Sequence, residues 1–236
     1  MYTLALDTTS RTMSVAVFRD ETMAGELFVD SGNTHSETML PAIERMLGSL
    51  SLSPADIGLY AVTRGPGSFT GVRIGISTVK GLAFRNSGEP EVPIAPVSTL
   101  LALAYNFLGF GSEKRPALIV PVMDARRAQV YTAAFSVSGG APERLTPDSA
   151  LSLEELGDLL AELSQGRTIL FTGDGYSLTK DHFGKPELRE RISAAETPAP
   201  LQRLRGSSIA LCGLEAFRRG ETVNEKVLVP SYLRGI

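Results

Sequence analysis

A glycine turn between an apolar strand and a helix is the stretch of this sequence best suited to bind a ligand. Gly65-Pro66-Gly67 follows the apolar residues 59–63 and precedes a helical pattern that begins near Phe69. Such a turn can leave backbone N–H groups free at the positive end of the helix dipole, which suits an anion. It is not a phosphate loop of the Gly-Lys-Ser/Thr type, because those residues do not follow at the right spacing. The pattern is also typical of a tight turn that binds nothing.

Glycines inside the helix that follows this turn need a physical reason. Gly71, Gly75 and Gly81 fall within it, and each costs ~0.5–1 kcal/mol of helix stability relative to alanine. The reason we expect is close approach, either by a neighbouring backbone or by something held at the helix N-terminus.

The sequence offers little for metal binding or nucleophilic catalysis. Its two histidines, His35 and His182, are far apart, and the residue four positions after His35 is Met39. Two imidazoles on one helix face would need the spacing i, i+4. The single cysteine, Cys212, excludes an intramolecular disulfide and a cysteine-rich zinc site. No G-x-S-x-G elbow is present. We therefore predict no metal site and no catalytic residue.

The composition is that of an ordinary globular protein. The chain has 236 residues, of which 43% are hydrophobic and 21% charged, enough for one or two domains. A net charge of −3 gives no basic footprint for direct nucleic-acid binding. The first ten residues lack the basic and apolar regions of a signal peptide, and no apolar run is long enough to span a bilayer. These features predict a cytoplasmic protein with no membrane contact.

The first half of the chain reads as three strands followed by alternating helices and strands. The strands cover about 2–6, ending at Asp7, then 13–18 and 23–29, with short polar turns typical of an antiparallel meander. Thr34 and Glu37 fit a capping box before a helix. Beyond the central strand and glycine-bearing helix, we expect a strand at 93–97 and a helix from Ser98 to about residue 107.

The second half repeats this pattern without repeating the residues. A strand at 118–123 ends at Asp124, as the first strand of the chain ends at Asp7, and Gly173-Asp174-Gly175 takes the place of the first glycine turn. We therefore predict an N-terminal lobe at 1–108, a linker at 109–116 and a C-terminal lobe at 117–206. A last helix near 207–219 is expected to pack back on the N-terminal lobe.

An apolar stripe runs along the helix that follows the first three strands. It carries Met39, Ile43, Met46 and Leu50 at helical spacing. The stripe fits a face packed on the sheet, and it also fits a partner face, because methionine-rich surfaces adapt to partners. The pattern alone leaves both interpretations open.

Two units that each open with a strand ending in Asp resemble the actin, sugar-kinase and Hsp70 (ASKHA) architecture. The resemblance implies an α/β fold with two lobes, each a mixed sheet flanked by helices, and a nucleotide cleft between the lobes. It places Asp7, Thr8, Asp124, Gly173 and Gly175 at a vestigial nucleotide site. The family hairpins carry glycine beside the Asp, whereas this chain has threonines after Asp7 and Ala125-Arg126 after Asp124. Ordinary ATP hydrolysis is therefore not expected.

Several motifs in order resemble the TsaB (YeaZ) family and cover nearly the whole chain. They are LALDTTSRTMSVAV, HSETMLPAIERML, GPGSFTGVRIGISTVKGLA, VSTLLALA, MDARRAQVY and PSYLR. The resemblance implies a non-catalytic subunit that forms a homodimer and binds a TsaD-type catalytic subunit. With a TsaE-type ATPase, that subunit forms N6-threonylcarbamoyladenosine at position 37 of tRNA. The resemblance also implies that this chain meets tRNA only indirectly, that it is not an enzyme by itself, and that it needs no cofactor, with nucleotide possible only in the assembled complex.

The same resemblance explains the missing metal pair and locates a partner face. TsaD carries His-x-x-x-His on a helix whose counterpart here begins at residue 98 and has no His, Asp or Glu through residue 103. The family dimerises through the helices that match 35–50 and 69–84. The residues expected at the partner interface are Met39, Ile43, Met46, Leu50, Gly71, Val72, Gly75 and Ile76.

The sequence leaves two alternative functions open, those of a small-molecule kinase and of a peptidase. An ATP-dependent small-molecule kinase would use Asp7 and Asp124 in the cleft, but its phosphate loop should be lined with glycine. A glycoprotease-like peptidase, the historical label of TsaD relatives, would need metal ligands or a serine triad around one of the two histidines.

Overall fold

The computed structural model describes residues 1–236 except 31, 33, 86–90, 190–191 and 234–236. The chain divides into two compact units, each described here by itself. The first comprises Met1–Ala102 and Leu204–Tyr232, and the second is built on Leu103–Arg203. The division falls within helix α3 (Thr99–Tyr105), not in the stretch 109–116 that was predicted as a linker. That stretch belongs to the second unit, where Gly109 donates a backbone hydrogen bond to Gly140.

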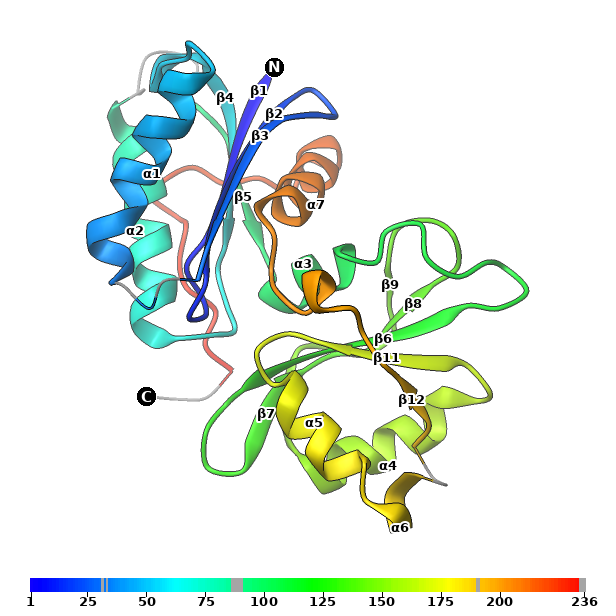
Figure 1. The fold of residues 1–236 in the computed structure, drawn as a ribbon. Helices are drawn as coiled ribbons and strands as arrows, with labels where there is room; N and C mark the ends of the chain where they lie inside the picture. Colours follow the sequence, from blue (N-terminus) through cyan, green and yellow to red (C-terminus); the bar gives the residue numbers. More distant parts are fainter. Residues whose placement is uncertain (31, 33, 86–90, 190–191, 234–236) are drawn as a thin grey trace. The chain divides into compact units, whose positions relative to one another are not determined.

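A five-stranded mixed sheet forms the centre of the first unit in the described part of the chain (Figure 1). Its order is β3-β2-β1-β4-β5. The strands β1–β3 form the predicted antiparallel meander, and β4 and β5 add to β1 in parallel. The strand bounds are β1 Tyr2–Asp7, β2 Met13–Arg19, β3 Thr22–Val29, β4 Ile57–Thr63 and β5 Ile94–Val97.

The two faces of this sheet are covered by different helices. Helices α1 (His35–Ser49) and α2 (Phe69–Arg85) lie on one face and α7 (Gly206–Arg218) on the other (Figure 1). Towards α1 and α2 the sheet presents large apolar side chains, including Leu4, Leu6, Val15, Val17, Tyr60 and Val62. This face buries the main hydrophobic core of the unit.

The face towards α7 is made of small residues, which lets the helix come close. A Cβ on Gly213 would lie 2.5 Å from the Cβ of Ala61, and one on Gly206 would lie 2.9 Å from the Cβ of Ala16. The start of α7 is fixed by Glu26 of β3, whose carboxylate accepts hydrogen bonds from the Ser207 N–H (3.0 Å) and from Arg205 (2.5 Å). The last helix therefore belongs to the first unit, although about a hundred residues of the second unit precede it.

In its described residues, the second unit has a seven-stranded sheet whose main path is β10-β7-β6-β11-β12. Its strands are β6 Ala117–Asp124, β7 Gln129–Thr132, β8 Phe135–Val137, β9 Glu143–Arg144, β10 Ser149–Ser152, β11 Thr168–Thr172 and β12 Ala194–Ala195. Its helices are α4 Leu153–Ser164, α5 Tyr176–Phe183 and α6 Pro186–Arg189. The core is formed by side chains of β6, β11, α4 and α5, among them Val120, Val122, Phe171, Leu156 and Phe183.

Strand order confirms the predicted duplication. In both units two antiparallel strands precede the opening strand in sheet order, and two parallel strands follow it. The second unit differs by an inserted β8–β9 hairpin between β7 and β10, which the sequence reading did not separate from β7. The predicted α/β class, with a mixed sheet flanked by helices in each unit, is confirmed.

Short connections also agree with the sequence in most places. Residues Pro54–Asp56 form a 3₁₀ turn before β4, as predicted, and Ala199–Leu201 form another before α7. The capping box of Ser152 and Glu155 is present at α4. The box predicted at Thr34 is wrong: the Thr34 hydroxyl donates to the Glu37 carboxylate (2.8 Å), and the Glu37 N–H donates to the Thr34 backbone oxygen (3.1 Å).

Candidate functional site

Asp7 ends β1 with its carboxyl group fully buried and held by its own unit. Its Oδ1 accepts hydrogen bonds from the Thr9 N–H (3.0 Å), the Thr9 hydroxyl (2.7 Å) and the Thr63 hydroxyl (2.6 Å). Its Oδ2 has no hydrogen-bond partner among the described residues. Burial raises the pKa of Asp7 above its ordinary value, and the hydrogen bonds from Thr63 and Thr9 and the nearby His35 oppose that rise. The lone pairs of Oδ1 that a metal ion would use are thus already engaged by donors of the chain itself.

The glycine turn packs directly against the Asp7 hairpin. A Cβ on Gly67 would lie 2.6 Å from the Thr9 carbonyl oxygen, and a Cβ on Gly71 would lie closer still to the carbonyl oxygen of Thr8. The Thr8 hydroxyl donates to the Gly71 carbonyl (2.7 Å), and the Ser68 N–H donates to the Thr9 carbonyl (2.7 Å). Thr8 and Thr9 are each 1% exposed as a result. Close backbone approach, the first of the two reasons expected for the glycines, holds for Gly71.

Three N–H groups after the glycine turn have acceptors inside the chain. The Ser68 N–H donates to the Thr9 carbonyl (2.7 Å), the Gly71 N–H to the Ser68 hydroxyl (3.2 Å) and the Val72 N–H to the Ser68 carbonyl (2.8 Å). An anion at the start of α2 would compete with these bonds for its donors. The three bonds favour the interpretation as a tight turn.

The second Asp-bearing hairpin is also satisfied locally. Asp124 at the end of β6 accepts from the Arg126 N–H (2.8 Å), and its other oxygen lies 3.3 Å from the Arg126 guanidinium. The Asp124 N–H in turn donates to Asp174 in the second glycine turn (3.2 Å). Arg126, Arg127 and Ala128 all have positive φ, so this hairpin holds its shape in a backbone region that side chains disfavour.

The two glycines of the second turn are required by packing on β6. A Cβ on Gly175 would lie 2.7 Å from the Val122 side chain, and the Gly175 N–H donates to the Val122 carbonyl (2.9 Å). Gly173, with φ +101°, presses on the same carbonyl. Asp7 and Thr8 lie in the first unit and Asp124, Gly173 and Gly175 in the second. That they meet at one vestigial nucleotide cleft stays a prediction.

The predicted interface residues lie mainly in the core, and this corrects the sequence interpretation. Met39, Ile43, Val72 and Ile76 are 1–4% exposed and belong to the core cluster between the helices and the sheet. Gly71 and Gly75 face inward: a Cβ on Gly75 would lie 2.7 Å from the Thr8 hydroxyl oxygen and 3.4 Å from Leu6. Met46 and Leu50 are half-buried against the same cluster, close to Gly25. The apolar stripe is therefore a packing face.

An outward groove does run between α1 and α2, but apart from Met39 it is lined by residues that were not predicted at the interface. It is a hollow of about 410 Å³ lined by Ser36, Met39, Leu40, Phe69, Thr70, Arg73, Ile74, Ser77 and Thr78. Leu40 is 48% exposed and Phe69 44% exposed. Leu40 and Phe69 could have been found from their positions next to inward-facing residues. Leu40 directly follows the buried Met39, and Phe69 precedes the inward-facing Gly71 by two positions.

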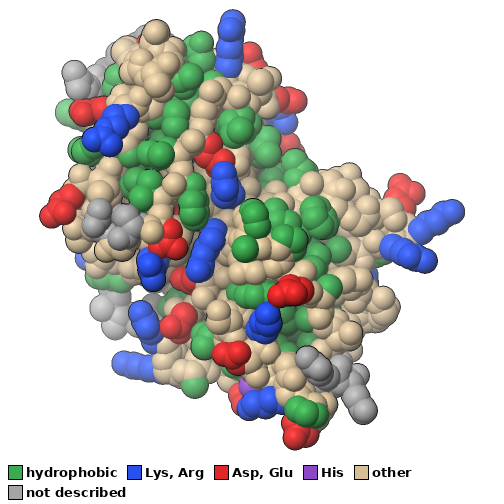
Figure 2. Space-filling view, in the orientation of Figure 1, with side chains coloured by type: hydrophobic (Ala, Val, Ile, Leu, Met, Phe, Trp, Pro, Cys, Tyr) green, Lys and Arg blue, Asp and Glu red, His purple; other side chains and the backbone are tan. Residues whose placement is uncertain are grey.

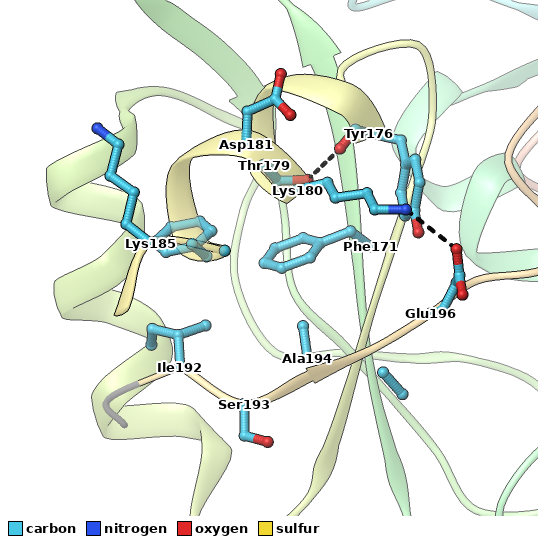
Figure 3. A pocket seen from close by; sticks show the side chains of 13 residues that line it. Phe171, Tyr176, Thr179, Lys180, Asp181, Lys185, Ile192, Ser193, Ala194 and Glu196 are labelled. Atoms are coloured by element: carbon cyan, nitrogen blue, oxygen red, sulfur yellow. Dashed lines mark hydrogen bonds and ion pairs between the residues drawn. The ribbon is translucent and has the colours of Figure 1, made fainter. Parts of the chain in front are cut away.

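A hollow of about 710 Å³ belongs to the second unit (Figure 3). It lies between α5 and residues 192–196, with the ring of Phe171 at its centre. At one end Lys180 and Glu196 form an ion pair (3.1 Å), and the Thr179 hydroxyl donates to the Tyr176 carbonyl (2.8 Å). Asp181 and Lys185 point away from the hollow in this view. The hollow has an apolar floor and no converging set of ionisable groups, so it offers no evident catalysis.

Neither histidine stands in a catalytic arrangement. The Nε2 of His35 lies 2.7 Å from the Ser10 carbonyl oxygen and ties α1 to the β1–β2 turn. His182 meets the Phe183 ring edge-on at 4.9 Å. Among the described residues, no group of three or more His, Cys, Asp or Glu side chains could hold a metal ion. No helix in the same residues is long and apolar enough to cross a membrane.

Comparison with known proteins identifies the family. A protein called tRNA threonylcarbamoyladenosine biosynthesis protein TsaB from Bacillus subtilis is 34% identical over 99% of this chain and 94% of its own length. The protein of the same name from Escherichia coli is 31% identical over 99% of this chain and 95% of its own length. The chain belongs to the TsaB family.

Two further comparisons agree with TsaB membership. The family model described as TsaD, tRNA N6-adenosine threonylcarbamoyltransferase, matches residues 30–234. The solved structure of YeaZ from Pseudomonas aeruginosa is 25% identical and covers 98% of this chain and 99% of its own, with a TM-score of 0.79. A second structure, described as similar to peptidase YeaZ from the same organism, gives a TM-score of 0.77 at 26% identity over 99% of each chain. TsaB membership is established, and with it a role in threonylcarbamoyladenosine biosynthesis.

Proposed function

We propose that this chain is a non-catalytic subunit of the complex that forms N6-threonylcarbamoyladenosine at position 37 of tRNA. In this role it binds and supports a TsaD-type catalytic subunit, works with a TsaE-type ATPase, and forms a homodimer when the catalytic subunit is absent. The observation that carries the proposal is the full-length similarity to two proteins named for this pathway. A role in tRNA modification would place the chain in the cytoplasm.

The polar groups of the Asp7 hairpin form hydrogen bonds with other groups of the chain, which supports a subunit that catalyses no reaction by itself. At the Asp7 hairpin, Oδ1 of Asp7 accepts hydrogen bonds from Thr9 and Thr63, and the Thr9 carbonyl accepts one from the Ser68 N–H. A kinase would need those groups for phosphate and metal. A peptidase would need a histidine that activates a nucleophile, whereas His35 meets a carbonyl oxygen and His182 a phenyl ring. The described residues therefore favour neither a kinase nor a peptidase.

Surface charge supports an indirect relation to tRNA. On the face drawn in Figure 2, Lys and Arg side chains are interspersed with Asp and Glu and do not gather into one basic surface. The net charge of −3 agrees. Direct tRNA binding depends largely on phosphate contacts from clustered basic residues, so the catalytic subunit would provide most of them.

The partner face we propose is the α1–α2 groove rather than the buried stripe. Its exposed apolar side chains are Leu40 and Phe69, and the α2 side chains Thr70, Ser77 and Thr78 are small enough for another helix to approach. Exposed apolar patches of this kind commonly mark an interface.

Reconstitution tests the proposed function. The TsaD-type and TsaE-type subunits of the same organism are mixed with tRNA, ATP and a source of the threonylcarbamoyl group, with and without this chain. We expect modified adenosine only when this chain is present, co-purification of the chain with the TsaD-type subunit, and no ATP turnover by the chain alone. Full modification without the chain, or ATP turnover by the chain that Asp7→Asn abolishes, would contradict the proposal.

A further inference from the structure

The last parallel strand of each sheet holds the same place in the duplicated topology. In the first sheet β5 lies at one end and pairs with β4, and in the second sheet β12 lies at one end and pairs with β11. Each follows a strand, a glycine turn and a helix, which are β4 and α2 in the first unit and β11 and α5 in the second. The surroundings of β5 therefore indicate what the equivalent place at β12 can accept.

The outer edge of β5 is covered by residues 223–232, called the strap below. Ile94 of β5 donates a backbone hydrogen bond to the Val223 carbonyl (2.9 Å) and accepts one from the Val223 N–H (2.8 Å), so the two residues form an antiparallel pair. Leu228 is 1% exposed and belongs to the same core cluster as Ile94 and Val79 of α2. The strap thus satisfies the edge with its backbone and adds an apolar side chain to the core that α2 covers.

The edge of β12 has no such cover in the part of the chain that the structure describes. Its strand partner there is β11 alone, and residues 193–195, Ser-Ala-Ala, are small and exposed. The backbone groups of an edge strand that face away from its sheet form a template for another strand. Charged side chains and proline commonly block such an edge, and residues 193–195 contain neither.

The face of β12 towards α5 is also open, and α5 is much shorter than α2. Helix α2 has 17 residues and α5 has 8. The hollow of about 710 Å³ lies between α5 and residues 192–196. In Figure 3 the side chains of Ile192 and Ala194 point to the side of the Phe171 ring, and Ser193 points the other way. A segment paired with β12 would therefore place every second side chain on the side of the hollow.

We propose that β12 and this hollow bind an extended segment of another protein chain, in the way that the strap binds β5. The segment pairs its backbone with the free edge of β12 and places an aliphatic or aromatic side chain against Phe171. Because β12 has two residues, the backbone hydrogen bonds are few, and burial of that side chain supplies much of the affinity. The charged lining residues are two lysines and two carboxylates, so the site favours an apolar segment without net charge. This inference does not depend on the proposed function.

Nuclear magnetic resonance of the isotope-labelled full-length chain tests the proposal. The probe is a peptide of alternating threonine and valine with a central leucine, acetylated and amidated at its ends. We expect the peptide to shift the backbone amide signals of residues 193–196 and of α5, and to leave those of β5 in place. The size of the shifts during the titration gives the Kd.

Two altered peptides separate the backbone of the segment from its side chain. A peptide with N-methylated backbone nitrogens cannot donate to the edge of β12. A peptide with serine in place of the central leucine keeps the backbone and loses the apolar group. We expect each change to raise the Kd by about tenfold or more.

A substitution on β12 tests the same site from the side of the protein. Ala194→Trp fills the hollow from the strand and should raise the Kd by about tenfold or more. Lys185→Gln is the matched control, because Lys185 lines the hollow but points away from it, and it should change the Kd less than about twofold. Thermal melts of both variants accompany the titrations. If Ala194→Trp lowers the melting temperature, the altered peptides decide the matter with the unaltered chain.

Three results would overturn the proposal. The first is the absence of shifts at residues 193–196 with the peptide at millimolar concentration. The second is a set of shifts at β5, because the peptide would then have displaced the strap. The third is equally tight binding of the N-methylated peptide, because the hollow would then take an apolar group without strand pairing.

Discussion

Asp7 and Glu26 are carboxyl groups of one sheet whose surroundings shift their pKa values in opposite directions. Asp7 is fully buried and is held by hydroxyl and N–H donors on one oxygen. Burial also penalises the charge of Glu26, but the hydrogen bonds from Arg205 and Ser207 and the Arg205 charge outweigh that penalty and lower the pKa of Glu26. The pKa of Asp7 is raised because burial is not outweighed. The contributions of the two carboxyl groups to the free energy of unfolding therefore depend on pH in opposite directions.

The Asp7 carboxyl should make the protein less stable as pH rises. Because its folded pKa is raised, the folded state holds a proton that the unfolded state has lost, from the ordinary Asp range up to the folded pKa. The free energy of unfolding falls with pH across that window, and the loss is complete above it. Asp7→Asn keeps the acceptor oxygen and removes the ionisation. Chemical denaturation of both proteins at a series of pH values should show the variant gaining stability relative to the parent as pH rises.

Glu26→Gln provides the contrast in the same measurement. The folded pKa of Glu26 is lowered, so its stabilisation is present above the ordinary Glu range and is lost as pH falls through the folded pKa. Hydrogen bonds to charged groups contribute about 1.5–3 kcal/mol, so Glu26→Gln should destabilise the protein by about that much at neutral pH and less in acid. If the stability difference for Asp7→Asn did not vary with pH, the assignment of a raised pKa would be wrong.

Helix α2 shows why element positions were easier to predict than element faces. Its residue range followed from the glycine turn and the helical apolar pattern, and the structure gives Phe69–Arg85. The direction of Gly71 and Gly75 did not follow, because a glycine has no side chain to reveal whether its side of the helix meets water or protein. Only the contacts with Thr8 and Leu6 decide this.

Weak local signals account for most other differences from the sequence predictions. Strand β10 is half-buried and has serine at both ends, and β12 has two exposed residues, so neither has the apolar run of a buried strand. The boundary between the units lies inside a helix with buried small side chains, where no glycine or proline marks it. For the candidate site, the sequence predicts Asp7, Asp124 and both glycine turns. It does not predict that, within each unit, the polar groups of the hairpin bond to those of the glycine turn.

Substituting the α2 glycines tests the inward orientation. Gly75→Leu adds a side chain where the Thr8 hydroxyl oxygen would lie 2.7 Å from Cβ, and overpacking of this kind costs about 1–3 kcal/mol. Gly81→Ala on the same helix is the control: nothing lies within 4 Å of its Cβ, so the gain in helix propensity should stabilise the protein by ~0.5–1 kcal/mol. Urea denaturation measures both. An unchanged unfolding free energy for Gly75→Leu would show that Gly75 faces water.

At the scale of the whole molecule, the chain leaves its first unit and returns to it. The first 102 residues lack α7, which buries Ile209 and Leu214 against the small-residue face of the sheet, and they lack Leu228 of the strap. The main part of the second unit, Leu103–Arg203, lies between these parts of the sequence and contains its own core. The core of the second unit thus comes from one stretch of sequence and that of the first unit from two, so the two units should differ in their ability to fold alone.

We predict that a fragment of residues 103–203 folds alone and that a fragment of residues 1–102 does not. The shorter N-terminal piece would leave Ala16 and Ala61, now covered by Gly206 and Gly213, open to water together with the rest of that face. Adding residues 204–236 as a separate peptide should restore the unit. Cys212, the single cysteine, reports the result: it is 5% exposed, and burial raises its pKa, so its thiol should react slowly once α7 has docked. Cooperative melting of residues 1–102 alone, with no slowing of Cys212 labelling when the peptide is mixed in, would show that α7 is dispensable to the first unit.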